Sequence, residues 1–304
     1  MYSYVTYGLG VSSILPLPEL TAMEGVNADV TIRLGKSGRE VPETDHNGSY
    51  FELTPQEAYL YWEQVGGFVV REGKEITVDR LPGVEDSLLR LPLLGAVFSA
   101  AIHQRGYLGL HGSAVAIDGQ AVVFVGASGQ GKSTTAASLY ARGHTLLADD
   151  LVVLDMNHES GVPMLYPSFP QLKLFPEAAA ASLGDDPESL PRLMVGIEKR
   201  SRVAKTGFSP QPVPLKCIYI LRTDPAFAIE DLLPQEQIVQ LIQQSYGALV
   251  FKLWLKGAAA AAHLRKCVAL ANSVPLRWLK RPRDLESLSE LAQLVEGDVR
   301  ETTE

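Results

Sequence analysis

The chain has 304 residues, 46% of them hydrophobic, which suits a globular protein of one large or two ordinary domains. The formal net charge of -8 argues against general binding to nucleic acids or anionic membranes. No apolar run reaches the roughly 18 residues of a membrane helix, and the first residues lack a basic export signal. We therefore expect a cytoplasmic protein with no membrane or nucleic-acid partner, in which Cys217 and Cys267 are buried free thiols.

The first 90 residues contain short alternating stretches and no recognisable nucleophile or metal constellation. Residues Val30 to Leu34 alternate as a half-buried strand does, and Phe68–Val70 with Ile76–Val78 predict a hairpin. Tyr50 to Trp62, with a proline near its start, is predicted as a short helix. Residues 1–90 are thus predicted to form a small α+β region. Its many aromatic residues favour core packing, with a peptide-docking face as the alternative.

The next segment predicts a helix and then a hairpin. Apolar residues recur at spacings of three and four from Pro92 to Gln104, and Gly106 ends this pattern. Two apolar runs then flank Asp118-Gly119, a dipeptide that strongly favours a tight hairpin turn. The second run leads into a phosphate-binding motif, so an antiparallel strand is predicted beside the strand that carries the motif. An all-parallel nucleotide-binding sheet would lack that strand.

Residues 126–133 have the Walker A pattern Gly-x-x-x-x-Gly-Lys-Ser, between an apolar run and a predicted helix. Glycines allow backbone N–H groups to turn toward an anion, and the helix start adds its unpaired donors. Lys132 is expected to reach the terminal phosphates of a nucleotide, and Ser133 to bind Mg²⁺. A glycine-rich turn without a ligand is the alternative, which the agreement of motif and context disfavours. The candidate nucleotide ligands are Gly126, Ala127, Ser128, Gly129, Gln130, Gly131, Lys132, Ser133 and Thr134.

The strand predicted from Thr145 to Leu154 carries two adjacent aspartates, Asp149 and Asp150. A carboxylate at such a place beside a phosphate loop is a common Mg²⁺ ligand. Successive side chains of an extended strand point in opposite directions, so one aspartate can face a metal and the other an incoming hydroxyl, unless the backbone bends. A turn or capping role for one of them is the alternative. Ser133 and Asp150 are the candidate metal ligands, and either aspartate is a candidate base.

The remaining sequence contains one basic cluster and several predicted elements. Lys199, Arg200 and Arg202 are candidate phosphate or substrate contacts, with a solvated loop as the alternative. The predicted elements are a strand over Lys216–Leu221, helices over Gln235–Tyr246 and Ala258–Asn272, a strand over Val274–Leu279, and a closing helix that begins at Asp284.

The run from Leu110 to Asp150 resembles the catalytic core of HPr kinase/phosphorylase, a family that shares its nucleotide fold with phosphoenolpyruvate carboxykinase. The resemblance rests on Leu110-His111-Gly112, the phosphate loop, Arg142-Gly143-His144 and Leu147-Ala148-Asp149-Asp150. It implies an α/β fold with a mixed sheet and a kinase domain over residues 91–304. It also implies that Lys132 and Ser133 hold phosphate and Mg²⁺, that one aspartate is the base, and that His111 tunes this base. The residues alone favour a core histidine at position 111.

The downstream signature Glu-x-Arg-Gly-Leu-Gly of HPr kinases has no counterpart here. The order of other motifs resembles the HPr-kinase-related proteins of lasso-peptide gene clusters. These motifs are Leu15-Pro16-Leu17-Pro18, Leu93-Leu94-Gly95, His103-Gln104-Arg105-Gly106, the Leu108 to His111 stretch and the Arg277 to Leu285 stretch. This resemblance implies ATP- and Mg²⁺-dependent phosphorylation of the C-terminal serine of a precursor peptide.

Three other functions stay open at this point: a small-molecule kinase, an HPr-type protein kinase, and a nucleotide-gated binding module. The paired aspartates favour an enzyme, because binding alone needs only one metal carboxylate. The oligomeric state and the nucleotide preference are not determined by these residues.

Overall fold

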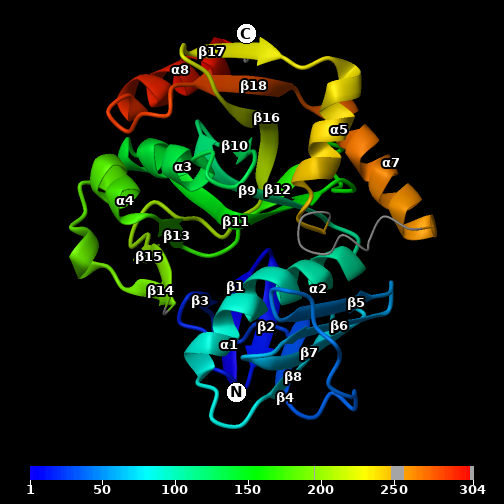
Figure 1. The fold of residues 1–304 in the computed structure, drawn as a ribbon. Helices are drawn as coiled ribbons and strands as arrows, with labels where there is room; N and C mark the ends of the chain where they lie inside the picture. Colours follow the sequence, from blue (N-terminus) through cyan, green and yellow to red (C-terminus); the bar gives the residue numbers. More distant parts are fainter. Residues whose placement is uncertain (195, 248–256, 302–304) are drawn as a thin grey trace.

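The computed structural model describes residues 1–194, 196–247 and 257–301, which form a mixed α/β fold with three β-sheets (Figure 1). The lower half of the molecule in this view holds the N-terminal sheet and the helices that cover it. The upper half holds the other two sheets and the C-terminal helices. The mixed α/β class expected from the sequence is confirmed.

The N-terminal sheet has eight strands in the order β3-β1-β2-β4-β8-β7-β6-β5. Their bounds are β1 (Tyr2–Thr6), β2 (Leu9–Ser13), β3 (Thr21–Ala22), β4 (Val30–Leu34), β5 (Ser49–Leu53), β6 (Glu57–Trp62), β7 (Gly66–Arg71) and β8 (Glu75–Arg80). The predicted strand β4 and the predicted hairpin β7–β8 are confirmed.

The helix predicted over Tyr50–Trp62 is wrong, because this segment forms the antiparallel hairpin β5–β6. Aromatic side chains pack well on a pleated, half-buried surface, and here that preference outweighs the weak helical spacing. Pro55 lies in the turn between the two strands, where the Thr54 backbone N–H donates to the Glu57 carbonyl at 2.8 Å. The aromatic rings contribute to packing, as in the contact of Trp62 with Phe68 at 5.7 Å between centroids.

A helical run of three segments covers the N-terminal sheet: α1 (Asp86–Pro92), the π-helical η1 (Leu93–Val97) and α2 (Phe98–Gln104). The predicted helix over Pro92–Gln104 is confirmed, although the run begins at Asp86. Leu89 and Phe98 pack in one core with strand residues such as Ile32. The same core includes Leu151 of the upper half, so the two halves share packed apolar contacts.

The central sheet of the upper half has seven strands in the order β10-β9-β11-β12-β16-β18-β17, and β10 also pairs with β16. Their bounds are β9 (Leu108–Ile117), β10 (Gln120–Val125), β11 (Thr145–Asp155), β12 (Met164–Tyr166), β16 (Val213–Thr223), β17 (Ala228–Asp231) and β18 (Leu276–Arg281). Strand β10 is antiparallel to β9 and parallel to β16. The predicted hairpin at Asp118-Gly119 and the mixed sheet are therefore confirmed.

Helices cover both faces of the central sheet. On one face, α3 (Lys132–Ala141) and α8 (Leu288–Glu301) pack in a core that contains Cys217. On the other face, α5 (Pro234–Gln244) and α7 (Gly257–Ser273) pack in a core that contains Cys267. Both thiols are buried and free, as expected. The closing helix starts later than predicted, because the Asp284 carboxylate accepts the Glu286 N–H in a turn.

A small third sheet has the order β13-β15-β14 and lies beside α3. Its strands are β13 (Gln171–Leu174), β14 (Arg192–Met194) and β15 (Ile197–Val203), and α4 (Pro176–Leu183) and the short η2 (Pro187–Ser189) connect β13 to β14. Leu172 and Leu174 of β13 pack against α3 in a separate small core. The basic cluster lies in β15 and is therefore part of a strand, not a loop.

Candidate active site

The Walker A segment connects the end of β10 to the start of α3. Gly129 and Gly131 have φ angles of +80° and +85°, in the left-handed region that favours glycine. A Cβ atom at Gly131 would lie 2.0 Å from Nη2 of Arg281. This nitrogen donates to the Gln130 carbonyl oxygen at 2.7 Å, so Arg281 fixes the loop from outside. Both glycines are thus required by the shape of the loop.

Lys132 lies against its own loop. Its Nζ donates to the carbonyl oxygens of Gly126 at 2.8 Å and Ala127 at 3.2 Å, and the residue is only 8% exposed. Burial lowers the pKa of Lys132, and repulsion from Lys199 lowers it further. The amino group is therefore fixed at the mouth of the loop, where a phosphate group could replace the two carbonyl oxygens as its partner.

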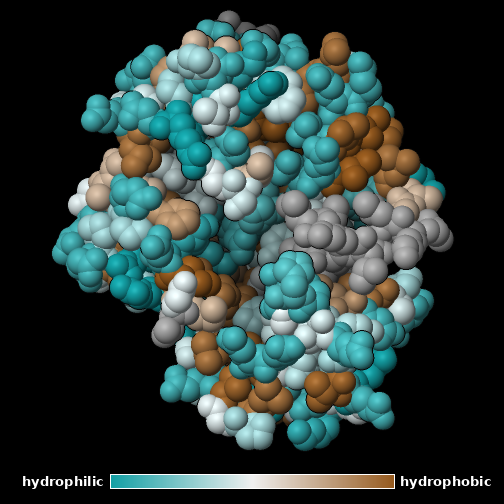
Figure 2. All heavy atoms as spheres, in the orientation of Figure 1, coloured by the Kyte–Doolittle hydropathy of each residue, from teal (hydrophilic) through white to brown (hydrophobic). Residues whose placement is uncertain are grey.

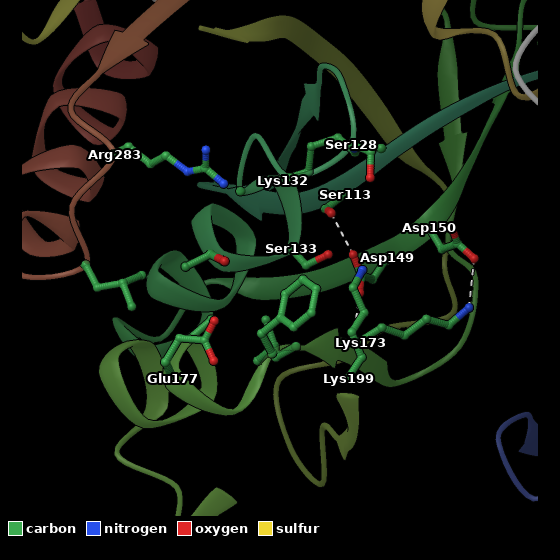
Figure 3. Close-up of a pocket in the computed structure, with 18 of the residues that line it drawn as sticks. Ser113, Ser128, Lys132, Ser133, Asp149, Asp150, Lys173, Glu177, Lys199 and Arg283 are labelled. Atoms are coloured by element: carbon green, nitrogen blue, oxygen red, sulfur yellow. Dashed lines mark hydrogen bonds and ion pairs between the residues drawn. The ribbon is translucent and has the colours of Figure 1, made fainter. Parts of the chain in front are cut away.

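Asp149 is buried and doubly hydrogen-bonded. Its Oδ1 accepts the Ser113 hydroxyl at 2.6 Å, its Oδ2 accepts the Lys173 backbone N–H at 2.7 Å, and the residue is 3% exposed. In the close-up view, the Ser133 hydroxyl at the start of α3 points toward this carboxylate (Figure 3). The two hydrogen bonds fix the orientation of Asp149 relative to the phosphate loop.

Asp150 interacts with a different set of groups. Its Oδ2 lies 2.7 Å from Nζ of Lys173, and its Oδ1 lies 3.2 Å from Nδ1 of His111. Burial favours the neutral acid, but the attraction of Lys173 and His111 outweighs it and holds the pKa of Asp150 far below its usual value. The φ angle of Asp150 is +84°, so the strand bends at this residue. Both aspartates consequently line one pocket, instead of pointing to opposite faces of the sheet.

His111 lies in β9, directly across from Leu151 of β11. Its Nδ1 is 3.0 Å from the Asp150 carbonyl oxygen, and its ring meets the Tyr246 ring edge-on at 5.8 Å between centroids. The side chain is 30% exposed and lines the pocket, so His111 is not enclosed in the core as the residues alone suggested.

The pocket has a volume of about 420 Å³ and is lined by Ser128, Gly129 and residues 131–134 of the phosphate loop, by both aspartates, and by three cationic side chains that were not predicted as site residues from the sequence. These are Lys173, Arg281 and Arg283. Lys173 lies between two leucines of a short strand, Arg281 is the final residue of β18, and Arg283 follows that strand. Nothing local distinguishes such residues from surface charges. Their common location depends on three segments that meet only in the folded chain.

Only one residue of the predicted basic cluster reaches the pocket. Lys199 lines it, with Nζ 5.4 Å from the centroid of the Phe175 ring. Arg200 is buried and pairs with Glu188 at 3.2 Å, and Arg202 pairs with Asp185 at 3.1 Å. The cluster occupies a strand, and its neighbouring side chains alternate in direction. The structure therefore turns Arg200 and Arg202 away from the pocket, against the sequence-based expectation.

The donor atoms in the pocket suit Mg²⁺. Within residues 1–194, 196–247 and 257–301, no group of three or more His, Cys, Asp or Glu side chains could hold a metal ion. Mg²⁺ usually takes only one or two carboxylates and completes its shell with waters and substrate phosphates. The Ser133 hydroxyl and a neighbouring aspartate would provide such a partial set of hard oxygen ligands.

Comparisons with known proteins match the segment of the chain that contains His111, the phosphate loop and both aspartates. Residues 106–167 match the family model of the HPr Serine kinase C-terminal domain. A 100-residue segment is 37% identical to an HPr kinase/phosphorylase of Treponema pallidum (strain Nichols), over 33% of this chain and 28% of that protein. A 54-residue segment is 50% identical to an HPr kinase/phosphorylase of Lactobacillus acidophilus, over 17% of each chain.

The chain thus matches less than a third of the length of these relatives. A solved structure of the Hpr(Ser) kinase/phosphatase from Coxiella burnetii aligns with a TM-score of 0.34 and 14% identity, over 64% of this chain and 90% of that chain. Among the described residues, no helix has the length and apolar character needed to cross a membrane.

Proposed function

We propose that the protein is an ATP- and Mg²⁺-dependent kinase that transfers a phosphoryl group to a serine hydroxyl of a peptide. The observation that carries this proposal is the presence of two differently bonded aspartates in one pocket with the Walker A lysine. Their distinct partners suit distinct tasks. The similarity of residues 106–167 to the HPr serine kinase domain supports the same class of reaction.

The nucleotide would bind through its phosphates. The loop amides and Lys132 hold the β- and γ-phosphates, and Lys132 exchanges its carbonyl partners for phosphate oxygens. Ser133 and Asp149 provide the metal ligands, because the Ser133 hydroxyl points toward Asp149 (Figure 3). This assignment replaces Asp150, the first candidate from the sequence. Bound Mg²⁺ supplies neutralisation of the phosphate charge. Lys199 is suitably placed to add to that neutralisation.

Asp150 is the proposed base. The acceptor oxygen attacks the γ-phosphorus, a new P–O bond forms, and the bond between the γ-phosphorus and the bridging oxygen of ADP breaks. The hydroxyl proton passes to Asp150. His111 and Lys173 fix the orientation of this carboxylate and keep it ionised before the reaction. Phosphoryl transfer requires mainly such positioning and charge neutralisation.

The proposed acceptor is the C-terminal serine of a lasso precursor peptide, and the reaction would take place in the cytoplasm. The order of motifs outside the catalytic segment supports this acceptor. Residues 1–90 are the proposed substrate-docking region, and residues 91–304 the proposed kinase domain. The helical run α1–η1–α2 joins the two, because it packs on the N-terminal sheet while Gly95 lies beside Asp150.

The test is mass spectrometry of a precursor peptide that ends in serine, after incubation with the protein, ATP and Mg²⁺. We expect a gain of one phosphate on the terminal serine and an equal amount of ADP. The Lys132→Ala variant should lose this activity, because the γ-phosphate loses its cation. Binding of ATP without any phosphorylated peptide would contradict the proposal and favour a small-molecule kinase or a nucleotide-gated binding module.

A further inference from the structure

A second pocket of about 360 Å³ opens between the two halves of the molecule. We call it the junction groove: Leu88 and Leu91 of α1 line one wall, and Leu193 and Met194 of β14 line the other. In Figure 1, α1 and β14 face each other across this junction, and Figure 2 shows apolar side chains gathered there.

The junction groove reaches the candidate active site at two points. Lys173 lines both pockets, and its amino group is the ion-pair partner of Asp150. Leu94 also lines the groove, and the next residue, Gly95, is so close to the site that its Cβ would lie 4.0 Å from Oδ2 of Asp150. The groove contains no residue of the phosphate loop. It therefore leads to the proposed base by a path separate from the nucleotide.

The walls of the groove offer two kinds of contact. The leucines of α1 and β14 present apolar surface. Arg192 is exposed and has no ion-pair partner in the part of the chain that the structure describes. Glu19 and Arg90, which also line the groove, pair with each other at 2.8 Å. A peptide segment that carries a carboxylate and an apolar side chain would complement these two features.

We propose that the junction groove binds the extended peptide segment that precedes the acceptor serine. An acidic side chain of this segment pairs with Arg192, and an apolar side chain packs on Leu88 and Leu91. The serine then reaches Asp150 past Lys173. This inference rests on the proposed peptide-kinase function and adds the surface that selects the peptide.

The test uses two groove variants with matched controls. Leu91→Trp fills the groove, and Arg192→Glu reverses its unpaired charge. The controls, Leu264→Trp and Lys205→Glu, make the same kinds of change at exposed positions outside both pockets. With the serine-ended precursor peptide, we expect the groove variants to raise the KM for peptide by about tenfold or more, the equivalent of one lost ionic or apolar contact. The KM for ATP and the rate of ATP hydrolysis without peptide should stay within about twofold of the wild-type values.

Unchanged peptide KM values in both groove variants would overturn the inference. Equal increases of the peptide KM in the control variants would also overturn it. A direct measurement of peptide binding tests the groove independently of the proposed kinase reaction. Fluorescence anisotropy of the same peptide, labelled at its N-terminus, should show binding to the wild type and weak binding to both groove variants, even if no phosphate is transferred. Absence of peptide binding to the wild type would overturn the groove proposal, whereas binding without transfer would overturn only the kinase reaction.

Discussion

At the scale of single residues, Lys173 links the two candidate catalytic carboxylates. Its backbone N–H holds Asp149 and its amino group holds Asp150, each at 2.7 Å. Burial disfavours the ammonium ion, but the attraction and hydrogen bond of Asp150 outweigh this and raise the pKa of Lys173. One lysine therefore fixes adjacent aspartates in two different environments, which allows the two carboxylates to perform different tasks.

This division of tasks predicts different consequences for the same substitution at the two positions. Asp150→Asn removes the proposed proton acceptor, so kcat should fall by about 10²–10⁴-fold while ATP affinity stays within about twofold. Asp149→Asn should instead raise the Mg²⁺ concentration needed for half-maximal activity. Steady-state kinetics with a Mg²⁺ titration, and calorimetry for ATP binding, measure both effects.

Asp155→Asn is the matched control for this pair, because Asp155 ends the same strand but lies outside the pocket. This substitution should leave kcat, the ATP affinity and the Mg²⁺ concentration for half-maximal activity unchanged. If Asp149→Asn abolished transfer without any change in Mg²⁺ dependence, and Asp150→Asn shifted that dependence, the two roles would be exchanged.

At the scale of elements, α8 is attached to the end of α3 by one carboxylate. Glu296 accepts hydrogen bonds from Arg142 at 2.7 and 2.8 Å and lies 2.9 Å from His144. The hydrogen bonds from Arg142 and then His144 outweigh the effect of burial and lower the pKa of Glu296 to about 2. Because α3 begins at the phosphate loop, this contact also supports the nucleotide site from the far end of the helix.

Glu296→Gln should therefore destabilise the protein in a pH-dependent way. The folded-state pKa lies below the ordinary value, so the ionised carboxylate stabilises the fold above about pH 4.5, and this contribution is lost as the pH falls toward 2. We expect a loss of about 2 kcal/mol at pH 7, or a decrease in Tm of about 4 °C. The difference from the wild type should shrink below about pH 4.5.

Thermal unfolding followed by circular dichroism at several pH values measures this difference. Glu290→Gln makes the same change at an exposed position of α8 and should leave Tm unchanged. A Tm difference for Glu296→Gln that stays constant from pH 7 to pH 3 would show that the carboxylate charge does not contribute.

At the scale of the whole molecule, two cores on opposite faces of the central sheet enclose one thiol each. Cys217 lies in the core with α3 and α8, and Cys267 in the core with α5 and α7. Burial raises the pKa of Cys217 to about 12 and that of Cys267 to about 11. The thiolate is the reactive form, so both residues should be inert in the folded protein.

Alkylation with iodoacetamide at pH 8 should consequently label neither cysteine in the native protein. In a urea series, we expect both to become reactive at one common midpoint, the same at which circular dichroism shows loss of structure, because the two cores share one sheet. Peptide mass spectrometry after quenching reads each cysteine separately. Labelling of one thiol at lower urea than the other would show that the two faces of the sheet unfold independently.

The sequence alone determined the features that depend on near neighbours in the chain. The phosphate loop follows from glycines that lie a few residues apart, and the hairpin turn follows from the Asp118-Gly119 dipeptide. The paired aspartates are adjacent in the chain. Where local signals were weak, as in Tyr50–Trp62, strand pairing decided the structure, because aromatic side chains gain more from packing on a sheet than from a short exposed helix.

Only the tertiary structure decided which distant residues complete the site. Arg281 reaches the loop from 151 positions further along the chain, measured to its hydrogen-bond partner Gln130, and Lys173 and Lys199 approach from a separate small sheet. Arg200 looks equivalent to Lys199 in the sequence but points elsewhere, since adjacent strand residues face opposite sides. The local sequence sets backbone conformation, whereas the convergence of charges at one pocket depends on how whole elements pack.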